Sequence, residues 1–577
     1  MCSIGCAEPN DRITDIRLVQ GVTYTRVDTQ QGERLRLQFE AESGRLVRFR
    51  AWSIGVLAGL RLQVYDPNDE SIYDSTSVGT ELRIDALEIL TGGTYTVEMD
   101  WLEGEGVSSY RFDVIGFSSD RLVVQPRLSL DTPLAGHGRV RLPDGRLFLS
   151  GGHATGSGLA AGQLVPTAIT KLIDPVTGEV TPGQQMIEAR AYHASAVFPG
   201  GPFEGQVLVA GGLGETGDAL FSTEIYNPDT QTFTRGPDLP EPRAYLDALP
   251  IKVSSESEPL FLDNNIVLAF GERTRRGPQH SYTDGIYSEV DENLREIWRT
   301  DGELVQRISN GDDAALLESG RLFGKMVFQP TSRSIMFIGG GVDTIPSEPG
   351  CTQSQDNVCH CTSTAIPLCT EFRDCDGGSC NSIRSYTRKD LATDSVEVHR
   401  DGQRFTLPPS SRLNRARAAF GIAQLSGDRV LIAGGVTAVR RNFWGGEVGL
   451  LESPKTLDSV ELWTPNDVTD GTSGEWRVLQ PLSIPREHFE LVTLSDSAVY
   501  ALGGITPEPG GLRSVELVER YDDSLRRFQP VGNLTSGRAN AATLVTADGR
   551  EVWLIGGETS GQPTANIETI SLIEGAQ

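Results

Sequence analysis

The chain has 577 residues, with 51 lysines and arginines against 78 aspartates and glutamates, which gives a formal net charge of −27. This acidic balance argues against a nucleic-acid partner, because such partners are bound through excess positive charge. No run of 18 apolar residues occurs, so no transmembrane helix is predicted. The length allows about two to four domains.

Residues 1–10 are predicted to be a tether ahead of the first domain. They contain Cys2 and Cys6 beside small residues, and the chain begins at Met1 without a signal peptide. We predict Cys2 as a candidate lipidation site, left at the start of a surface-anchored protein once its signal segment is removed. The alternatives are a local disulfide between Cys2 and Cys6 or two thiols without a role.

Residues 11–120 alternate apolar and polar residues in short runs, as in Leu35-Arg36-Leu37-Gln38-Phe39. A period of two with turns between the runs predicts an antiparallel β-sandwich. The runs Leu62–Asn68, Gly93–Val97 and Ser109–Phe112 resemble the pre-peptidase C-terminal type of β-sandwich. This resemblance implies a module that accompanies secreted bacterial enzymes and surface proteins.

Residues 121–577 repeat one pattern, a short apolar strand that ends in a glycine pair or its remnant. A recurring unit with a fixed core indicates an array of supersecondary units rather than one continuous globule. The apolar strands are Leu147–Ser150, Val207–Ala210, Ile266–Phe270, Ile335–Ile338, Val430–Ala433, Val499–Leu502 and Val552–Ile555.

An arginine precedes six of the glycine pairs, each time just before a small or apolar strand. Its planar donor fork is suited to bonding carbonyls across a blade boundary. The first repeat has Leu134 at this place, and the third keeps only Gly271 of its glycine pair. The predicted structural arginines are Arg190, Arg243, Arg321, Arg417, Arg486 and Arg538.

Downstream of each glycine pair, a third strand with a polar turn is followed by a fourth strand. Two strands, a glycine pair and two further strands make one four-stranded blade, and the glycines allow neighbouring blades to approach closely. The fourth strands are expected to open with Phe233, Trp298, Phe405, Trp476 and Phe528.

This order of arginine, glycine pair and aromatic residue resembles the Kelch repeat family over about residues 123–577. The resemblance implies an all-β protein with a seven-bladed β-propeller behind the sandwich; six blades plus an irregular segment is the alternative. Only one strand, Ile567–Ile573, follows the last glycine pair. Residues 122–130 are therefore predicted to complete the last blade and close the ring. Entry through this outer strand predicts a sandwich on the face opposite the connections between strands two and three.

Residues 344–392 are predicted to be a cysteine-rich insertion within the propeller. They hold few apolar residues for a core, so we expect three disulfides to order them, in any of fifteen pairings. A zinc site that includes His360 is the alternative. Disulfides would place the protein in the periplasm, on the outer-membrane surface or outside the cell. The cysteines are Cys351, Cys359, Cys361, Cys369, Cys375 and Cys380.

The binding site is predicted on the connections between strands two and three, which leave a propeller on one face. The long connections 153–167, 342–393 and 436–455 all have this place, and elaborated loops on a rigid scaffold commonly carry recognition. A tryptophan in such a loop can anchor a sugar ring or a partner protein; alternatively, Trp444 packs its loop onto its own blade. The predicted binding residues are Phe443, Trp444, Arg440 and Arg441.

The sequence favours a non-catalytic, secreted or surface-anchored protein that binds or assembles with a protein or a glycan. No catalytic residue or metal ligand is predicted, and no hydrolase, nucleotide-binding or zinc-protease motif occurs. Copper radical oxidases of Kelch-like fold use a cysteine crosslinked to a tyrosine, whereas no cysteine here lies in a predicted blade strand. No cofactor is predicted; the acidic turn with Asp66, Asn68 and Asp69 is a candidate for calcium or a plain solvated turn.

Two other classes of function stay open. A carbohydrate-active enzyme or carbohydrate-binding propeller would show a carboxylate pair or a metal at the mouth of the central channel. A structural subunit of a surface assembly would show a large complementary face between copies.

Overall fold

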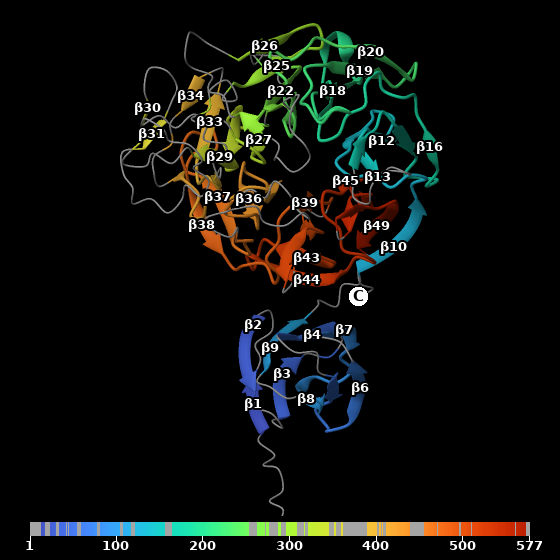
Figure 1. The fold of residues 1–577 in the computed structure, drawn as a ribbon, viewed down its shortest axis with the longest axis vertical. Coiled ribbons are helices and arrows are strands. Elements are labelled where there is room, and N and C mark those ends of the chain that lie inside the picture. The colour runs from blue at the N-terminus through green and yellow to red at the C-terminus, as the bar shows by residue number, and fades with distance from the viewer. Residues whose placement is uncertain are drawn as a thin grey trace, which may run out of the picture.

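The computed structural model is all-β, and the one helix among the described residues is a short 3-10 turn, Gly201–Phe203. Two sheets precede a ring of seven four-stranded sheets (Figure 1). The structure describes residues 13–17, 23–29, 34–41, 43, 46–54, 59–77, 81–103, 108–116, 122–155, 164–252, 262–271, 273–275, 287–289, 296–308, 317, 321–344, 351–353, 359–361, 389–400, 403–405, 407, 411–438, 455–469, 471–495, 498–508, 511–559 and 561–572.

The N-terminal sheets form a sandwich. Along β3, Leu37 and Phe39 are buried while Gln38 is exposed, and Phe39 stacks on Tyr95 of β8 at 5.6 Å between ring centroids. This alternation is the expected signature of a strand with one buried face. The first sheet has the order β1 (Ile13–Arg17), β3 (Arg34–Ala41), β8 (Gly93–Glu103), β5 (Gly59–Tyr65) and β6 (Ser71–Ser77). The second has the order β2 (Thr23–Thr29), β9 (Ser108–Gly116), β4 (Leu46–Ile54) and β7 (Glu81–Glu88). The finer resemblance to the pre-peptidase module stays a prediction.

The first four sheets of the ring each run antiparallel from an inner to an outer strand, and we call each sheet a blade. Blade 1 contains β11 (Gly138–Arg141), β12 (Leu147–Ser150), β15 (Thr170–Ile173) and β16 (Val180–Pro182). Blade 2 contains β17 (Ala194–Val197), β18 (Val207–Ala210), β19 (Thr223–Asn227) and β20 (Thr232–Arg235). Blade 3 contains β21 (Asp247–Ile251), β22 (Asn265–Ala269), β25 (Trp298–Thr300) and β26 (Val305–Arg307). Blade 4 contains β27 (Lys325–Gln329), β28 (Ser334–Ile338), β33 (Val396–Arg400) and β34 (Gln403–Phe405).

The remaining three blades keep this plan, and the second strand of each blade is buried between its neighbours because it is apolar at nearly every position. Blade 5 contains β35 (Gly421–Gln424), β36 (Val430–Ala433), β37 (Val460–Pro465) and β38 (Gly474–Leu479). Blade 6 contains β39 (Glu490–Thr493), β40 (Val499–Leu502), β43 (Leu517–Asp522) and β44 (Arg527–Asn533). Blade 7 contains β45 (Ala542–Val545), β46 (Glu551–Ile555), β49 (Asn566–Leu572) and β10 (Leu122–Ser129).

Blade 7 joins the two ends of the ring, as predicted. Its outer strand β10 pairs antiparallel with β49, so that Leu122 lies opposite Leu572 and Ser129 opposite Asn566. This pairing covers the edge of β49 that would otherwise present unpaired backbone groups. The predicted closure of the last blade by residues 122–130 is therefore confirmed.

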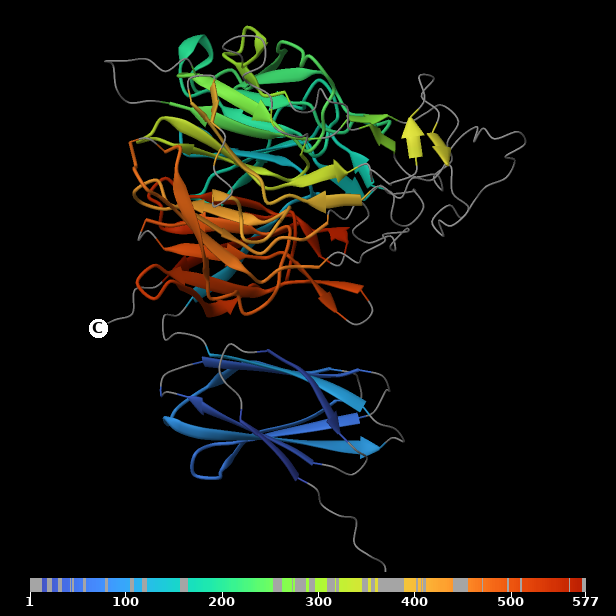
Figure 2. The same cartoon turned by 90° about the vertical axis from the view of Figure 1, so that its left-hand side faces the viewer.

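The sequence placed three features wrongly. Trp298 does not open a fourth strand: it lies in β25, the third strand of blade 3, opposite Leu268 of β22. Phe405 ends β34, the fourth strand of blade 4, rather than opening it. The sandwich does not lie under the face opposite the long connections, but beside the rim of the ring near β10 and β44 (Figures 1 and 2). Because β10 is the outermost strand of its blade, the chain meets the ring at its rim.

In five blades, the described parts of the connections between strands two and three form small hairpins on one face of the ring. Figure 2 shows β30 and β31 projecting from this face. In blade 4, β29 and β32 pair as the stem from which the cysteine-rich residues emerge. The hairpins are β13 (His153–Thr155) with β14 (Leu164–Pro166), β23 (Arg273–Arg275) with β24 (Tyr287–Glu289), β29 (Gly341–Thr344) with β32 (Lys389–Ala392), β30 (Cys351–Gln353) with β31 (Cys359–Cys361), β41 (Ile505–Glu508) with β42 (Gly511–Ser514), and β47 (Glu558–Thr559) with β48 (Gln562–Pro563).

Candidate binding site at the mouth of the central channel

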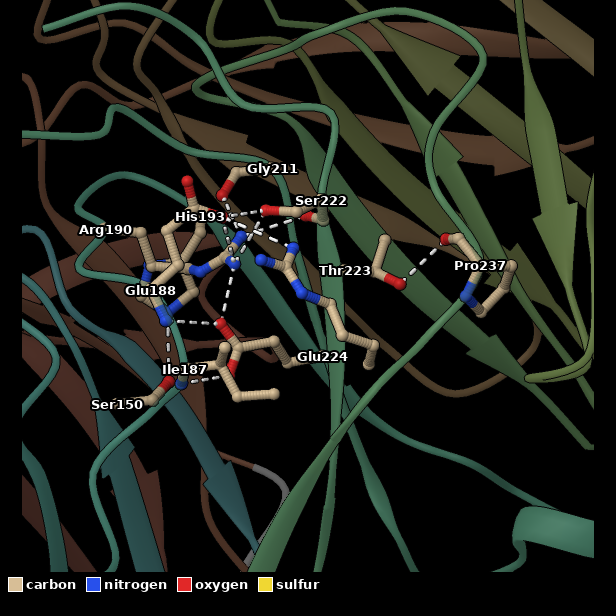
Figure 3. Close-up of polar contacts among 11 residues, drawn as sticks. Ser150, Ile187, Glu188, Arg190, His193, Gly211, Ser222, Thr223, Glu224 and Pro237 are labelled. Atoms are coloured by element: carbon tan, nitrogen blue, oxygen red, sulfur yellow. Dashed lines mark hydrogen bonds and ion pairs between the residues drawn. The ribbon is translucent and has the colours of Figure 1, made fainter. Parts of the chain in front are cut away.

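The predicted structural arginines are buried a few residues before the innermost strands, and each guanidinium binds its own blade. Arg190 Nη1 donates to the carbonyls of Gly211 and Ser222 at 2.8 and 2.9 Å (Figure 3). Its Nη2 donates to Ser222 Oγ at 3.0 Å and to Glu224 Oε1 at 2.8 Å. Burial lowers the pKa of Arg190, and the charge of Glu224 opposes that shift. The arginine therefore joins the glycine turn to the third strand.

A glutamate on the third strand completes this arrangement in five blades. Glu224 accepts hydrogen bonds from the backbone N–H groups of Ile187 and Glu188 at 2.7 and 3.0 Å, which fixes the segment just before the arginine (Figure 3). Buried carboxylates require such partners, because an uncompensated charge inside a protein is costly. The buried pairs are Arg190–Glu224, Arg321–Glu397, Arg417–Glu461, Arg486–Glu519 and Arg538–Glu568.

Blade 3 replaces the glutamate by an aromatic ring. Trp298 occupies the glutamate's position in the third strand, and the guanidinium carbon of Arg243 lies 3.8 Å from its ring centroid. Arg243 Nη1 also donates to the carbonyls of Phe270 and Glu296. Burial lowers the pKa of Arg243 to about 10 against the opposing charges of Glu241 and Glu296. A cation–π contact thus substitutes for the ion pair.

Blade 1 has lost the arginine and the glutamate together. Leu134 stands at the arginine's place, and Lys171 lies opposite Leu149, the register at which other blades carry the glutamate. Lys171 Nζ binds Asp131 Oδ2 at 2.6 Å instead. A buried glutamate without its arginine would be unfavourable, so the two positions change as a unit.

Contacts across the blade boundaries come from the backbone of the arginine, not from its side chain. The second glycine of each pair donates its N–H to the carbonyl of the next blade's arginine, or of Leu134 at the closure, at 2.8–3.0 Å. The expectation that the guanidinium crosses the boundary was wrong, because its donors are used within its own blade. The bonds are Gly152 to Arg190, Gly212 to Arg243, Gly271 to Arg321, Gly340 to Arg417, Gly435 to Arg486, Gly504 to Arg538 and Gly557 to Leu134.

Two residues after each arginine, the backbone takes the left-handed conformation around the channel axis. This ring is also linked by backbone bonds; Tyr245 N, for example, donates to Tyr192 O at 2.9 Å. A left-handed residue other than glycine costs about 1 kcal/mol, and such strain clusters at functional sites. With φ between 50° and 61°, the ring contains Gly136, Tyr192, Tyr245, Phe323, Ala419, His488 and Asn540.

Four of these residues place rings over one mouth of the channel, and we call them the aromatic mouth: Tyr192, Tyr245, Phe323 and His488. Their centroids are 4.6 Å apart for Tyr192 and Tyr245, and 5.2 Å apart for both Tyr245–Phe323 and Phe323–His488. Tyr192, Tyr245 and Phe323 are partly exposed, whereas the side chain of His488 is only 4% exposed. The mouth opens on the face of the long connections, because the innermost strands begin where the connections between strands two and three emerge.

Tyr192 is held by a buried pair from the two blades at the ring closure. His153 Nε2 lies 2.7 Å from Tyr192 Oη and 3.4 Å from Glu558 Oε1. Burial and the charge of Glu558 raise the pKa of Tyr192 well above its usual value, so its hydroxyl stays protonated and can donate. The pair fixes the tyrosine ring in the mouth.

Inside the mouth, the channel forms a cavity of about 210 Å³ that mixes apolar and charged walls. Arg139 Nη2 binds Glu490 Oε1 at 2.6 Å between blades 1 and 6. Burial raises the pKa of Glu490, but Arg139 and Lys325 outweigh it and the net shift is downward. Burial also raises the pKa of Asp247, whose net shift is upward. These four charged residues come from four different blades.

The structure leaves part of the predicted site undescribed. Arg440, Arg441, Phe443 and Trp444 lie outside the described residues, on the connection between β36 and β37. The aromatic mouth was missed by sequence reasoning, because its members share only their distance from the arginine. The ring of His488 contacts Phe323 edge-on in the mouth.

The cysteine predictions fall largely outside the described residues as well. Cys2 and the side chains of the six clustered cysteines are not described, although the backbone of β30 and β31 places Cys351 opposite Cys361. In the turn proposed for calcium, Asp66 Oδ1 accepts from the N–H groups of Asn68 and Glu70 at 2.8 and 2.9 Å. Within the described ranges, no group of three or more His, Cys, Asp or Glu side chains could hold a metal ion.

Comparison with known proteins identifies one repeat by sequence. Residues 189–240, which contain Arg190, the glycine pair of blade 2 and Glu224, match the Kelch motif. The chain has a Kelch propeller-like fold. No helix of the described part is long and apolar enough to cross a membrane.

Two solved structures that match the chain are distant in sequence. A structure described as a novel fungal alcohol oxidase of the AA5 family in complex with copper is 11% identical, with a TM-score of 0.44, over 78% of this chain and 76% of its own. YjhT is 13% identical, with a TM-score of 0.40, over 70% of this chain and 99% of its own. No curated protein matches. Neither structure supports an inference about activity.

Proposed function

We propose that this protein is a non-catalytic binding or assembly protein that recognises a protein or a glycan through the face of the aromatic mouth. The observation that carries the proposal is the strained ring in which Tyr192, Tyr245 and Phe323 are partly exposed, surrounded by hairpins on the same face. Tyrosine and histidine combine apolar surface with a polar edge, a composition common in recognition sites. The Kelch motif is compatible with this role.

We also propose that the protein acts outside the cytoplasm, secreted or held at a cell surface. Six cysteines between 351 and 380, in a segment poor in apolar residues, support disulfides and hence an oxidising compartment. A lipid at Cys2 would hold the sandwich near a membrane. Mass spectrometry of the native protein without reduction tests both ideas, since it reports disulfides and a lipid together; free thiols would remove the argument for the compartment.

Binding is tested with the full chain against two defined probes, a printed glycan array and a phage-displayed library of random peptides. The double variant Tyr245→Ala with Phe323→Ala removes two rings of the aromatic mouth. We expect it to bind the ligands selected by the unaltered protein at least about tenfold more weakly, because their apolar contact area is lost. A second double variant, Phe443→Ala with Trp444→Ala, tests the predicted loop.

The matched control is Leu525→Ala, which removes an exposed apolar side chain from the turn between β43 and β44. That turn lies on the opposite face, because strands three and four join where strands one and two join. The control should bind like the unaltered protein. Equal binding by the mouth variant and the control, or no selective ligand from either probe, contradicts the proposal.

One observation favours a second candidate, a carbohydrate-active enzyme or a carbohydrate-binding propeller. Asp247 and Glu490 bring two carboxyl groups to the same channel cavity, as acid–base chemistry on a sugar would require. The ion pair of Glu490 with Arg139 favours a structural role for that carboxylate. Turnover of a defined oligosaccharide panel, followed by NMR and abolished in Glu490→Gln, would support the enzyme.

A further inference from the structure

The channel cavity contains one lysine whose charge the structure does not balance by contact. Arg139 is bound to Glu490, and Arg538 to Glu568. Lys325, at the start of β27, also lines the cavity. Among the described residues, no carboxylate forms an ion pair with its ammonium group, although its charge acts to lower the pKa of both Asp247 and Glu490. Lys325 thus differs from the two arginines in having no ion pair of its own among the described residues.

The neighbouring carboxyl groups do not take the place of a partner. Asp247 Oδ1 accepts from the N–H of Ala248 at 3.0 Å, and its Oδ2 is 3.4 Å from the N–H of Met326. Burial raises the pKa of Asp247 although the charge of Lys325 opposes that shift, and Arg139 compensates the charge of Glu490. The cavity therefore favours an added anion near Lys325 over an added cation.

The rest of the wall suits an apolar body attached to that anion. Leu246, Phe420, Phe489, Leu502 and Leu554 line the cavity together with the aromatic mouth. The volume of about 210 Å³ is below the range of drug-sized sites, about 300–1,000 Å³. The cavity therefore suits a ligand smaller than a drug-sized molecule.

We propose that the channel cavity is a binding site for a small organic carboxylate, whose charged group binds Lys325 and whose apolar body lies against the leucine and phenylalanine walls. The ammonium donates up to three hydrogen bonds and would gain its missing charge partner. This site lies inside the channel and goes beyond the proposed recognition of a macromolecule at the aromatic mouth and the loops.

The test uses three probes of one shape and different charge: benzoate, benzamide and benzylamine. Each is titrated into the full chain and followed by saturation-transfer NMR and calorimetry. We expect benzoate to bind at one site, and at least about tenfold more tightly than benzamide, the factor that corresponds to about 1.4 kcal/mol. Lys325→Met should remove this preference for benzoate while leaving benzamide binding unchanged.

Two variants control for indirect effects. Lys252→Met removes an exposed lysine that follows β21 on the opposite face of the ring and should change nothing. Lys325→Arg keeps the charge and should retain at least part of the preference, even if Lys325→Met folds poorly. The proposal is overturned if benzoate shows no saturable binding, if Lys325→Arg binds benzoate no better than benzamide, or if benzylamine is the preferred probe.

Discussion

At the scale of single residues, the buried arginine of each blade is held by several contacts at once. Arg417 Nη1 donates to the carbonyls of Gly434 and Ser459, and its Nη2 lies 2.6 Å from Glu461 Oε1. Neither charged side chain of this pair is exposed. Removal of one partner would leave the other charge buried without compensation, which is more costly than loss of an exposed ion pair.

We predict that Arg417→Met lowers the free energy of unfolding of the ring by about 3–5 kcal/mol. Urea unfolding followed by tryptophan fluorescence measures this change in unfolding free energy, because Trp463 and Trp476 pack in the same blade. The control Arg477→Met breaks a pair with Glu475 in which both side chains are more than half exposed, and should cost within about 0.5 kcal/mol. If the two variants lose similar amounts of unfolding free energy, the buried pair contributes no more to stability than the exposed pair does.

The sequence identified the arginines but not their glutamates. Arginine repeats at a recognisable distance from the glycine pair, whereas the glutamate follows a connection whose length differs from blade to blade. A short signal does exist: Ser222-Thr223-Glu224, Ser395-Val396-Glu397 and Ser459-Val460-Glu461 share serine and glutamate two residues apart. In each of the three blades, the serine hydroxyl accepts a hydrogen bond from the arginine that also binds the glutamate of that blade.

At the scale of elements, two physical reasons require glycine in the glycine pair, and each can be tested separately. Gly434 has φ of +63°, and a Cβ there would lie 2.4 Å from the carbonyl oxygen of Arg486 in the next blade. Gly427, in the turn between β35 and β36 of the same blade, has φ of +72° with nothing within 4 Å of a Cβ. The first position requires backbone freedom and close approach, and the second only backbone freedom.

We therefore predict that Gly434→Ala destabilises the protein by about 3 kcal/mol or more, and Gly427→Ala by only about 1 kcal/mol. The difference reports the clash with the neighbouring blade, since both variants share the cost of a left-handed alanine. Thermal unfolding of the two single variants measures it. If Gly434→Ala is no less stable than Gly427→Ala, close approach of blades is not what requires the glycine.

The backbone conformation of these short segments explains why the aromatic mouth was not predicted from the sequence. Tyr192 and Tyr245 stand in runs that read as the start of a strand, and neither residue type indicates a left-handed backbone. The conformation is imposed by two long-range demands: the arginine side chain binds its own blade while its carbonyl binds the previous one. Only the folded ring brings these demands together, so the expected binding surface was placed on the loops alone.

At the scale of the whole molecule, closure of the ring depends on a strand that the sequence order places before the first blade. β10 covers β49 along its length, and Leu130, just beyond β10, is buried with Trp553 and Ile567. The closure could be predicted from the sequence because the last repeat lacks an outer strand and residues 122–130 belong to no other repeat. The placement of the sandwich could not be found that way, since strand order fixes the point of attachment but not the direction of a linker.

Closure leads to a prediction from two truncations that differ only in β10. Removal of residues 1–119 takes away the sandwich and should leave the ring monomeric, with a melting temperature near that of the full chain. Removal of residues 1–130 also exposes the edge of β49 and should lower the melting temperature and promote association through that edge. Differential scanning calorimetry and light scattering after size exclusion measure both. A synthetic peptide of residues 120–131 should restore the second truncation, because it supplies the missing strand in trans; equal stability of the two truncations would show that closure does not depend on β10.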